Sequence, residues 1–98
     1  MIELDDGVID YVREDAKNQG LRRPVVRIMG CGCVMNQDAV ELDVQEEEKA
    51  EGCEFYMEVE GVRFFVSPKV RHLANRGKIG IMTYGAGRFK RLVYFPLL

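Results

Sequence analysis

The first group of apolar positions along the chain repeats with the period of a helix. These positions share one helical face at the spacing i, i+1, i+4, i+8, and they are Val8, Ile9, Val12 and Ala16. Asp5 or Asp6 stands where an N-cap is expected, and Gly20 stands where a helix commonly ends. The pattern predicts one amphipathic helix near the start of the chain.

Two segments after this helix have the patterns of strands. The β-branched run 25–29 follows Pro24, which cannot donate a hydrogen bond to a β-ladder. In segment 39–44, apolar residues alternate with acidic ones, as in a half-buried strand. Segment 45–52 is charged and has no apolar face, so we expect an exposed loop there.

The second half of the chain predicts two hairpins with a short helix between them. In the first hairpin, the strand-like segments 53–59 and 62–66 flank the turn Glu60-Gly61. In the second, segments 78–84 and 89–95 flank the turn Gly85-Ala86-Gly87. Between the hairpins, Ser67 followed by Pro68 fits the start of a short helix. We therefore expect a mostly β domain of the α+β class with two helices, rather than a parallel βαβ sheet.

The length and composition fit a single domain over residues 1–98. Apolar residues make up 47% and charged residues 31% of the chain, which is the balance of a globular protein and not of a disordered one. No run approaches the roughly 18 apolar residues that a membrane span needs. Since the first six residues also lack the basic and apolar regions of a signal peptide, we expect a cytoplasmic protein that does not bind membranes.

Opposite charges are separated along the chain. Between Asp38 and Glu60 there are ten acidic residues and one base, whereas segment 61–98 contains eight bases and no acid. Neighbouring strands with opposite-charge pairs across them would explain this separation. The alternative is that the basic and aromatic cluster 88–95 forms a face for an anionic partner, although the net charge of −2 disfavours nucleic acid as that partner.

The residues with the most distinctive chemistry are Cys31-Gly32-Cys33. The chain has three cysteines, an odd number, and Cys31 and Cys33 are too close in sequence for an unstrained disulfide, so a secreted disulfide framework is disfavoured. Gly30 and Gly32 permit a turn in which both thiols converge on one metal. Thiolates are the ligands that iron, iron–sulfur clusters, zinc and copper(I) prefer. The motif therefore predicts a metal site.

Two thiols are half of a four-coordinate site. The remaining ligands would come from Cys53 and a fourth group, or from the same loop of a second chain, which favours a homodimer or a site completed by a partner. The alternatives are that Cys31 and Cys33 are simply small residues of a glycine-rich loop, and that Cys53 is a buried apolar residue.

Other motifs in the sequence are interpreted as structural. His72 lies on the short predicted helix and is expected at the surface rather than in a metal site. Segment 85–87 lacks the ending of a phosphate loop, and the acidic run 46–48 lacks the ligand spacing of a cation site. The sequence also contains neither a Cys-x-x-Cys redox motif nor a Ser/His/Asp triad. We therefore expect that the protein is not an enzyme.

The order of the elements, together with a few residues, matches a known pattern. The matching features are the capped helix, strand 25–29, the turn Gly30-Cys31-Gly32, the acidic strand 40–44 and the stretch 61–67 that leads into a short helix. This arrangement resembles the HesB/IscA-like (A-type) domain of iron–sulfur cluster biogenesis. The resemblance implies a distorted mixed β-barrel or sandwich, a dimer, and cysteines that bind iron or an iron–sulfur cluster for transfer to apo-protein clients.

The resemblance assigns a position to only one cysteine. Cys31 matches the first cysteine of the family, which follows a strand in a turn of small residues. The family also has a Cys-Gly-Cys stretch near the C-terminus, whereas this chain ends Phe95-Pro96-Leu97-Leu98. No role in the family therefore carries over to Cys33 or Cys53.

Three hypotheses for the function follow. The first is an iron or iron–sulfur binding protein, not an enzyme, that uses Cys31 and Cys33. The second is a metal-free interaction module of the same fold that uses its basic C-terminal half or a sheet edge. The third is a thiol redox sensor or carrier in which Cys31 is reactive because it is exposed near bases such as Arg27.

Overall fold

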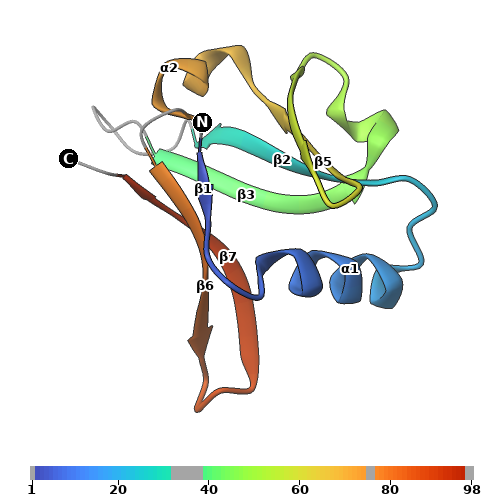
Figure 1. The fold of residues 1–98 in the computed structure, drawn as a ribbon, viewed down its shortest axis with the longest axis vertical. Helices are drawn as coiled ribbons and strands as arrows, with labels where there is room; N and C mark the ends of the chain where they lie inside the picture. The colour runs from blue at the N-terminus through green and yellow to red at the C-terminus, as the bar shows by residue number, and fades with distance from the viewer. Residues whose placement is uncertain (1, 32–38, 75–76, 97–98) are drawn as a thin grey trace.

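The computed structural model describes residues 2–31, 39–74 and 77–96, which form two mixed β-sheets and an N-terminal helix (Figure 1). In chain order the elements are β1 (Glu3–Leu4), α1 (Val8–Gln19), β2 (Pro24–Cys31), β3 (Ala39–Glu46), the 3-10 helix η1 (Glu47–Ala50), β4 (Glu54–Val59), β5 (Val62–Val66), the 3-10 helix η2 (Pro68–Val70), α2 (Arg71–Ala74), β6 (Gly77–Tyr84) and β7 (Phe89–Pro96). The mostly β, α+β class predicted from the sequence is confirmed. Within the described ranges, no helix has the length and apolar character needed to cross a membrane.

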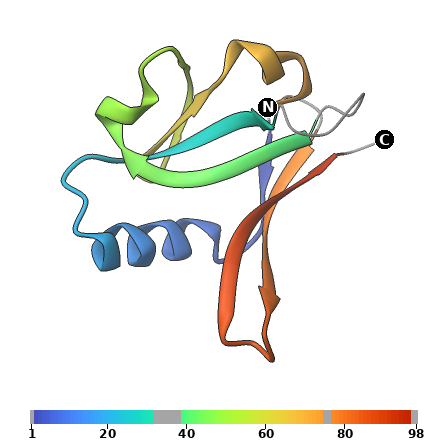
Figure 2. The same cartoon turned by 180° about the vertical axis from the view of Figure 1, so that it is seen from behind.

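The two sheets differ in size and both contain parallel and antiparallel pairs. The four-stranded sheet has the order β3-β2-β5-β4, and the three-stranded sheet has the order β1-β6-β7. Strand β2 is antiparallel to β3 and parallel to β5, and β6 is antiparallel to β7 and parallel to β1. Figures 1 and 2 show that α1 runs below the four-stranded sheet, while the β6–β7 hairpin passes the start of α1 and extends beyond it.

The core lies where the four-stranded sheet meets α1 and the three-stranded sheet. All four apolar residues of the predicted helix face are buried, as the sequence pattern requires. Alternate residues of β2 and β5 also point into this core, because side chains alternate between the two faces of a strand. The buried residues from the sheets include Val26, Ile28, Phe64, Val66, Ile79 and Leu92.

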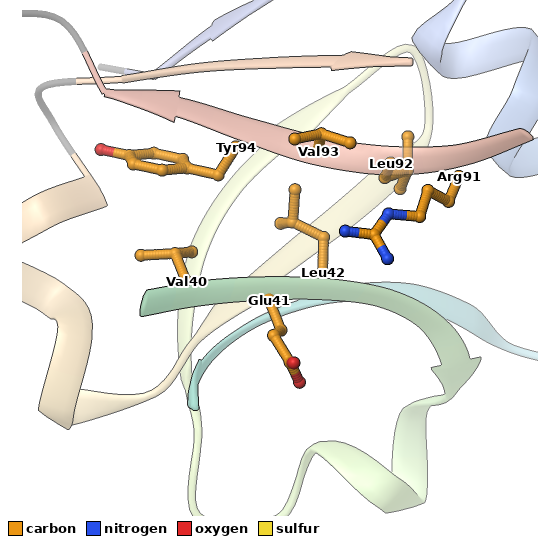
Figure 3. Close-up of a pocket in the computed structure, with 7 residues that line it drawn as sticks. All are labelled: Val40, Glu41, Leu42, Arg91, Leu92, Val93 and Tyr94. Carbon is orange, nitrogen blue, oxygen red and sulfur yellow. The ribbon is translucent and has the colours of Figure 1, made fainter. Parts of the chain in front are cut away.

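The sheets do not close into a barrel, which corrects one of the two forms implied by the resemblance. Strands β3 and β7 are sheet edges that face each other without a shared ladder. Figure 3 shows Val40 and Leu42 pointing from β3 toward β7, where Leu92 and Tyr94 lie opposite. Side chains rather than backbone hydrogen bonds therefore join these two edges, and a closed barrel would require the hydrogen bonds.

The start of α1 differs from the expectation. Its N-cap is Gly7, in a left-handed conformation with φ 87°, and neither Asp5 nor Asp6 provides a side-chain cap. Asp5 instead contacts the start of β6. Its backbone N–H donates to the carbonyl of Ile79 at 2.9 Å, and its carboxylate pairs with Lys78 at 3.3 Å. The sequence pattern did not reveal the short strand β1. Because β1 pairs with β6, Asp5 contacts β6 and does not cap the helix.

The prediction of an exposed loop over 45–52 is correct only in part: residues 48, 49, 51 and 52 are exposed, but most of the segment has regular structure. Strand β3 continues to Glu46 and is followed directly by η1, whose last residue Ala50 is buried. The Glu46 carboxylate accepts hydrogen bonds from the backbone N–H groups of Arg22 and Arg23, the latter at 3.2 Å. Glu46 therefore binds the backbone of the segment before β2, whereas Glu48 faces solvent.

The predicted turns and the second helix are confirmed. Glu60 and Gly61 both have positive φ, 49° and 83°, as the type I′ turn of a two-residue hairpin requires. The hydroxyl of Ser67 accepts a hydrogen bond from the N–H of Lys69 at 3.4 Å, so Ser67 caps η2. Gly20 ends α1 in a left-handed conformation with φ 70°.

Gly77, at the start of β6, lies against the ring of Tyr94. A Cβ atom at this position would lie 2.1 Å from atoms of that ring. We expect Gly77→Ala to displace the ring and lower the free energy of unfolding by about 1–3 kcal/mol. Urea denaturation measures the change, with the exposed Thr83→Ala in the same strand as a control that stays within about 0.5 kcal/mol of the parent. Equal stability of Gly77→Ala and the parent would contradict the close contact.

Tyr11 connects α1 to β7 and gives the fold a dependence on alkaline pH. Its hydroxyl donates a hydrogen bond to the carbonyl of Lys90 at 3.0 Å. Burial raises the pKa of Tyr11, and the negative charge of Asp15 raises it further. Because the folded state holds this proton more tightly, the resulting stability is complete below the ordinary pKa of about 10 and is lost as pH rises through the raised value.

A Tyr11→Phe variant lacks the group that titrates. We expect its free energy of unfolding to fall less steeply than that of the parent above about pH 10, and the two curves to run parallel at neutral pH. Urea denaturation at a series of pH values measures both slopes. Identical slopes in the alkaline range would show that Tyr11 is not shielded by the fold.

Candidate functional site

Strand β2 carries the chain to Cys31, its last residue. The backbone of Cys31 pairs with that of Ala39, the first residue of β3. A Cβ atom at the preceding Gly30 would lie 3.0 Å from Cγ1 of Val70, so the absence of a side chain there lets η2 pack against the end of β2. The side chain of Cys31 and the whole of Cys33 lie outside the described residues, and their role as metal ligands stays a prediction.

Cys53 is the predicted ligand whose side chain the structure describes. It is a half-buried free thiol just before β4, and its backbone N–H donates to the carbonyl of Ala50 at 2.9 Å. Its Sγ lies 3.5 Å from Sδ of Met29, where the weak S–H donor meets a weak acceptor. Met29 is two residues before Cys31 on the same strand, so the structure brings the Cys53 thiol to the end of β2 from which the Cys31-Gly32-Cys33 motif continues.

Arg27 on β2 contacts both β3 and the segment before Cys53. Arg27 donates from Nε and Nη2 to the two carboxylate oxygens of Asp43, at 2.8 and 2.5 Å. Its Nη1 also donates to the carbonyl of Lys49 in η1 at 3.0 Å. The hydrogen bonds to Asp43 raise the pKa of Arg27, which favours the charged guanidinium. The bidentate pair with Asp43 thus orients a side chain that also contacts the segment leading to Cys53.

His72 is exposed, and Glu47 of the acidic run pairs with two arginines. His72 is exposed on α2, as expected. Glu47 forms ion pairs with Arg63 and, at 3.7 Å, with Arg23, so it serves the packing of η1 on the sheet. Among the residues with described side chains, no group of three or more His, Cys, Asp or Glu is arranged to hold a metal ion.

A cavity of about 270 Å³ lies between the edges of β3 and β7 (Figure 3). Its lining combines apolar and polar side chains, and Figure 3 shows Glu41 pointing away from β7 while Arg91 lies alongside Leu42. No cysteine or histidine is among its lining residues in the described ranges. The cavity thus contains none of the predicted metal ligands, although Arg91 and Tyr94 belong to the basic and aromatic cluster 88–95.

Two features near the thiols were missed by the sequence analysis. Met29 was treated only as part of a strand. It is two residues before Cys31, and residues at this spacing lie on the same face of a strand, which could have placed both at one end of β2. Arg27 was considered only as a base that could activate Cys31, whereas the structure pairs it with Asp43. The opposite charges of Arg27 and Asp43 could have suggested a cross-strand pair, but only the register of β2 and β3 places them opposite each other.

The fold defines an α+β domain with an N-terminal helix, a second short helix and two small mixed sheets. It is found in a protein from Aquifex aeolicus whose solution NMR structure was determined as a structural-genomics target, with a TM-score of 0.64. The match covers 93% of this chain and 88% of that chain, at 14% sequence identity. At this identity the likeness concerns the fold alone. No family model matches the chain, and no curated protein matches it.

Proposed function

We propose that this protein binds iron or an iron–sulfur cluster through the thiols of Cys31 and Cys33, with Cys53 as a third ligand. The observation that carries the proposal is the position of the Cys53 thiol, which lies 3.5 Å from the sulfur of Met29. Met29 is two residues before Cys31 on β2. Successive residues of a strand advance by about 3.3 Å, so Cys31 begins within about 7 Å of Met29. In this proposal, thiolates from two separate parts of the chain, Cys53 and the motif that follows β2, bind the iron together.

The number of thiols indicates that the protein acts with a partner. An iron–sulfur cluster is commonly held by four thiolates, and this chain has three. In this proposal the missing ligand comes from a second copy or from an apo-protein that receives the cluster. A site with an incomplete ligand set suits temporary holding and transfer of its cargo, because a competing ligand has a free position to occupy.

The finer identity of the fold belongs to this proposal. The order of elements resembles the HesB/IscA-like type, and an open, distorted sandwich of two mixed sheets is compatible with it. In this proposal the chain is a divergent cytoplasmic member that uses the Cys31-Gly32-Cys33 motif. The pairing of Arg27 with Asp43 favours the metal hypothesis over the thiol sensor, since that base is already occupied.

Anaerobic reconstitution tests this function. We expect reduced protein incubated with ferrous iron and sulfide to gain thiolate-to-iron charge-transfer absorption, and to retain it after desalting. Zinc added in place of iron distinguishes a general thiolate site from one that builds a cluster. A spectrum equal to that of the same mixture without protein would contradict the proposal.

A further inference from the structure

The β6–β7 hairpin carries positive charge that the rest of the described structure does not neutralise. Arg88, Lys90 and Arg91 lie at and after its turn, and none of them is within ion-pair distance of a described carboxylate. The whole hairpin contains no acidic residue. Lys78, at the other end of the hairpin, is by contrast paired with Asp5. The positive charge without a partner therefore gathers around the turn.

Large apolar side chains are exposed at the same end of the hairpin. Tyr84 and Phe89, which pair across the hairpin next to the turn, are 50% and 55% exposed. Met82 is two residues before Tyr84, so it lies on the same face of β6, and it is 44% exposed. A cluster of large apolar side chains of this kind is typical of a contact surface. Residues 82–91, the hairpin tip, thus combine exposed aromatic rings with unpaired bases.

The hairpin tip projects from the molecule. Figures 1 and 2 show the hairpin passing α1 and its turn pointing away from the four-stranded sheet. Because side chains alternate along a strand, Tyr84 and Phe89 lie on one face of the hairpin and Lys90 lies on the other. Arg88 lies in the turn itself. A partner that contacts one face would therefore leave part of this chemistry unused, whereas a surface that the tip enters contacts both faces and the turn.

We propose that the hairpin tip docks on the surface of a membrane that contains anionic lipids. In this arrangement the bases of the tip lie among the anionic headgroups, where Lys and Arg are stabilised electrostatically. The rings of Tyr84 and Phe89 enter the boundary between headgroups and acyl chains, where aromatic side chains gather in membrane proteins. The sequence predicts no membrane binding because it lacks an apolar span, but contact at the membrane surface needs no span.

The geometry of the two rings favours lipids over a nucleic acid as the anionic partner. Tyr84 and Phe89 stack on each other at a ring-centroid distance of 5.5 Å, with 25° between the ring planes. Each ring thus covers one face of the other. A base of a single strand binds an aromatic side chain by stacking on an open ring face. Entry into a lipid surface requires only exposed apolar area, which both rings retain.

Acidic residues of α1 limit the contact to the tip. A cavity of about 770 Å³ lies in the corner between α1 and the hairpin, where Asp10 and Glu14 line the helix side and Arg88 and Lys90 line the hairpin side. Anionic headgroups repel the two carboxylates and attract the two bases. The tip therefore enters the surface while α1 stays outside it. Because attraction and repulsion act at short distance from each other, we expect binding that weakens strongly with salt.

Sedimentation with vesicles tests the docking. Metal-free protein, with reductant and chelator, is mixed with vesicles of phosphatidylcholine alone or of equimolar phosphatidylcholine and phosphatidylserine. We expect the parent to bind the anionic vesicles at least about tenfold more tightly than the neutral ones, and to be released by salt. Arg88→Glu/Lys90→Glu should bind the anionic vesicles at least about tenfold more weakly than the parent. The test is independent of metal binding, because no residue of the tip is a proposed ligand.

Two further variants control for net charge. Lys17→Glu/Arg22→Glu changes the charge by the same amount as the hairpin variant, at exposed positions outside the tip, and should bind nearly as the parent does. Asp10→Asn/Glu14→Gln removes the repulsion from α1 and should bind more tightly. Far-UV circular dichroism establishes that each variant is folded.

A single tryptophan measures entry of the tip into the lipid surface. The chain contains no tryptophan, so the emission of a Tyr84→Trp variant comes from the tip alone. We expect this emission to shift to shorter wavelength when anionic vesicles are added, because the ring leaves water. Phe55→Trp, at a position on β4 that is 58% exposed, is the matched control and should not shift.

Four results would overturn the proposal. They are a parent that does not bind anionic vesicles, equal binding to neutral and anionic vesicles, full binding by the folded Arg88→Glu/Lys90→Glu variant, and emission of Tyr84→Trp that bound vesicles leave unchanged. A labelled single-stranded oligonucleotide, added in place of vesicles, tests the alternative partner. Binding of the oligonucleotide without binding of anionic vesicles would assign the tip to nucleic acid instead.

Discussion

Phe64→Ala should remove a large part of the stability of this chain. Phe64 lies on β5, between β2 and β4, and is fully buried as the largest such side chain in the described core. Truncating a buried phenylalanine costs about 3–5 kcal/mol, through lost apolar burial and the cavity left behind. Because small domains have total stabilities of about 5–15 kcal/mol, we expect urea denaturation to show a partly unfolded protein at low denaturant.

Phe55→Ala provides the matched control for this prediction. Phe55 lies on the neighbouring edge strand β4, is 58% exposed, and touches the ring of Phe65 edge-on at 5.8 Å. Its loss should cost less than about 1.5 kcal/mol, the usual value of an aromatic pair. Equal effects of the two substitutions would mean that the core does not centre on the inner face of this sheet.

Cys31→Ser/Cys33→Ser should abolish retention of iron. A hydroxyl remains protonated where a thiol would become a soft thiolate ligand, so the double variant keeps at most one of the three proposed protein ligands. After anaerobic reconstitution and desalting, we expect no charge-transfer bands and at least about tenfold less bound iron than in the parent. Cys53→Ser, which keeps the pair in the motif, should retain weakened bands.

Met29→Leu is the control for this experiment. It removes the sulfur that contacts Cys53 but conserves side-chain volume, so it should cost less than about 1.5 kcal/mol and leave iron retention intact. Iron bands of parental strength in the double cysteine variant would show that the iron is held elsewhere. Loss of iron in Met29→Leu alone would mean that the thioether, and not the thiol motif, is essential.

The sequence was sufficient to predict the elements that depend on local patterns. The spacing of Val8, Ile9, Val12 and Ala16 predicted α1, and Glu60-Gly61 predicted the turn between β4 and β5, because both signals lie within a few residues of each other. The prediction failed where distant backbone competes for a residue. Asp5 resembles a helix cap in sequence, but pairing of β1 with β6, over seventy residues later, gives it a different role.

The candidate site was predictable only in part for the same reason. The motif Cys31-Gly32-Cys33 can be read from the sequence, but its relation to Cys53 depends on how β2, β5 and β4 lie side by side. The contact between Cys53 and Met29 joins residues 24 positions apart. The ion pair of Arg27 with Asp43 depends on the register of β2 and β3. Neither periodicity nor composition contains that information, because both describe only neighbours along the chain.

The iron content of protein purified without oxygen tests the central claim most directly. The proposal predicts iron at about half an equivalent per chain or more, since one site shared by two copies holds at least one iron, together with acid-labile sulfide if a cluster is present. The same preparation of Cys31→Ser/Cys33→Ser should contain only traces. Iron near background in the parent, or equal iron in both proteins, would contradict the claim that this thiol motif binds iron.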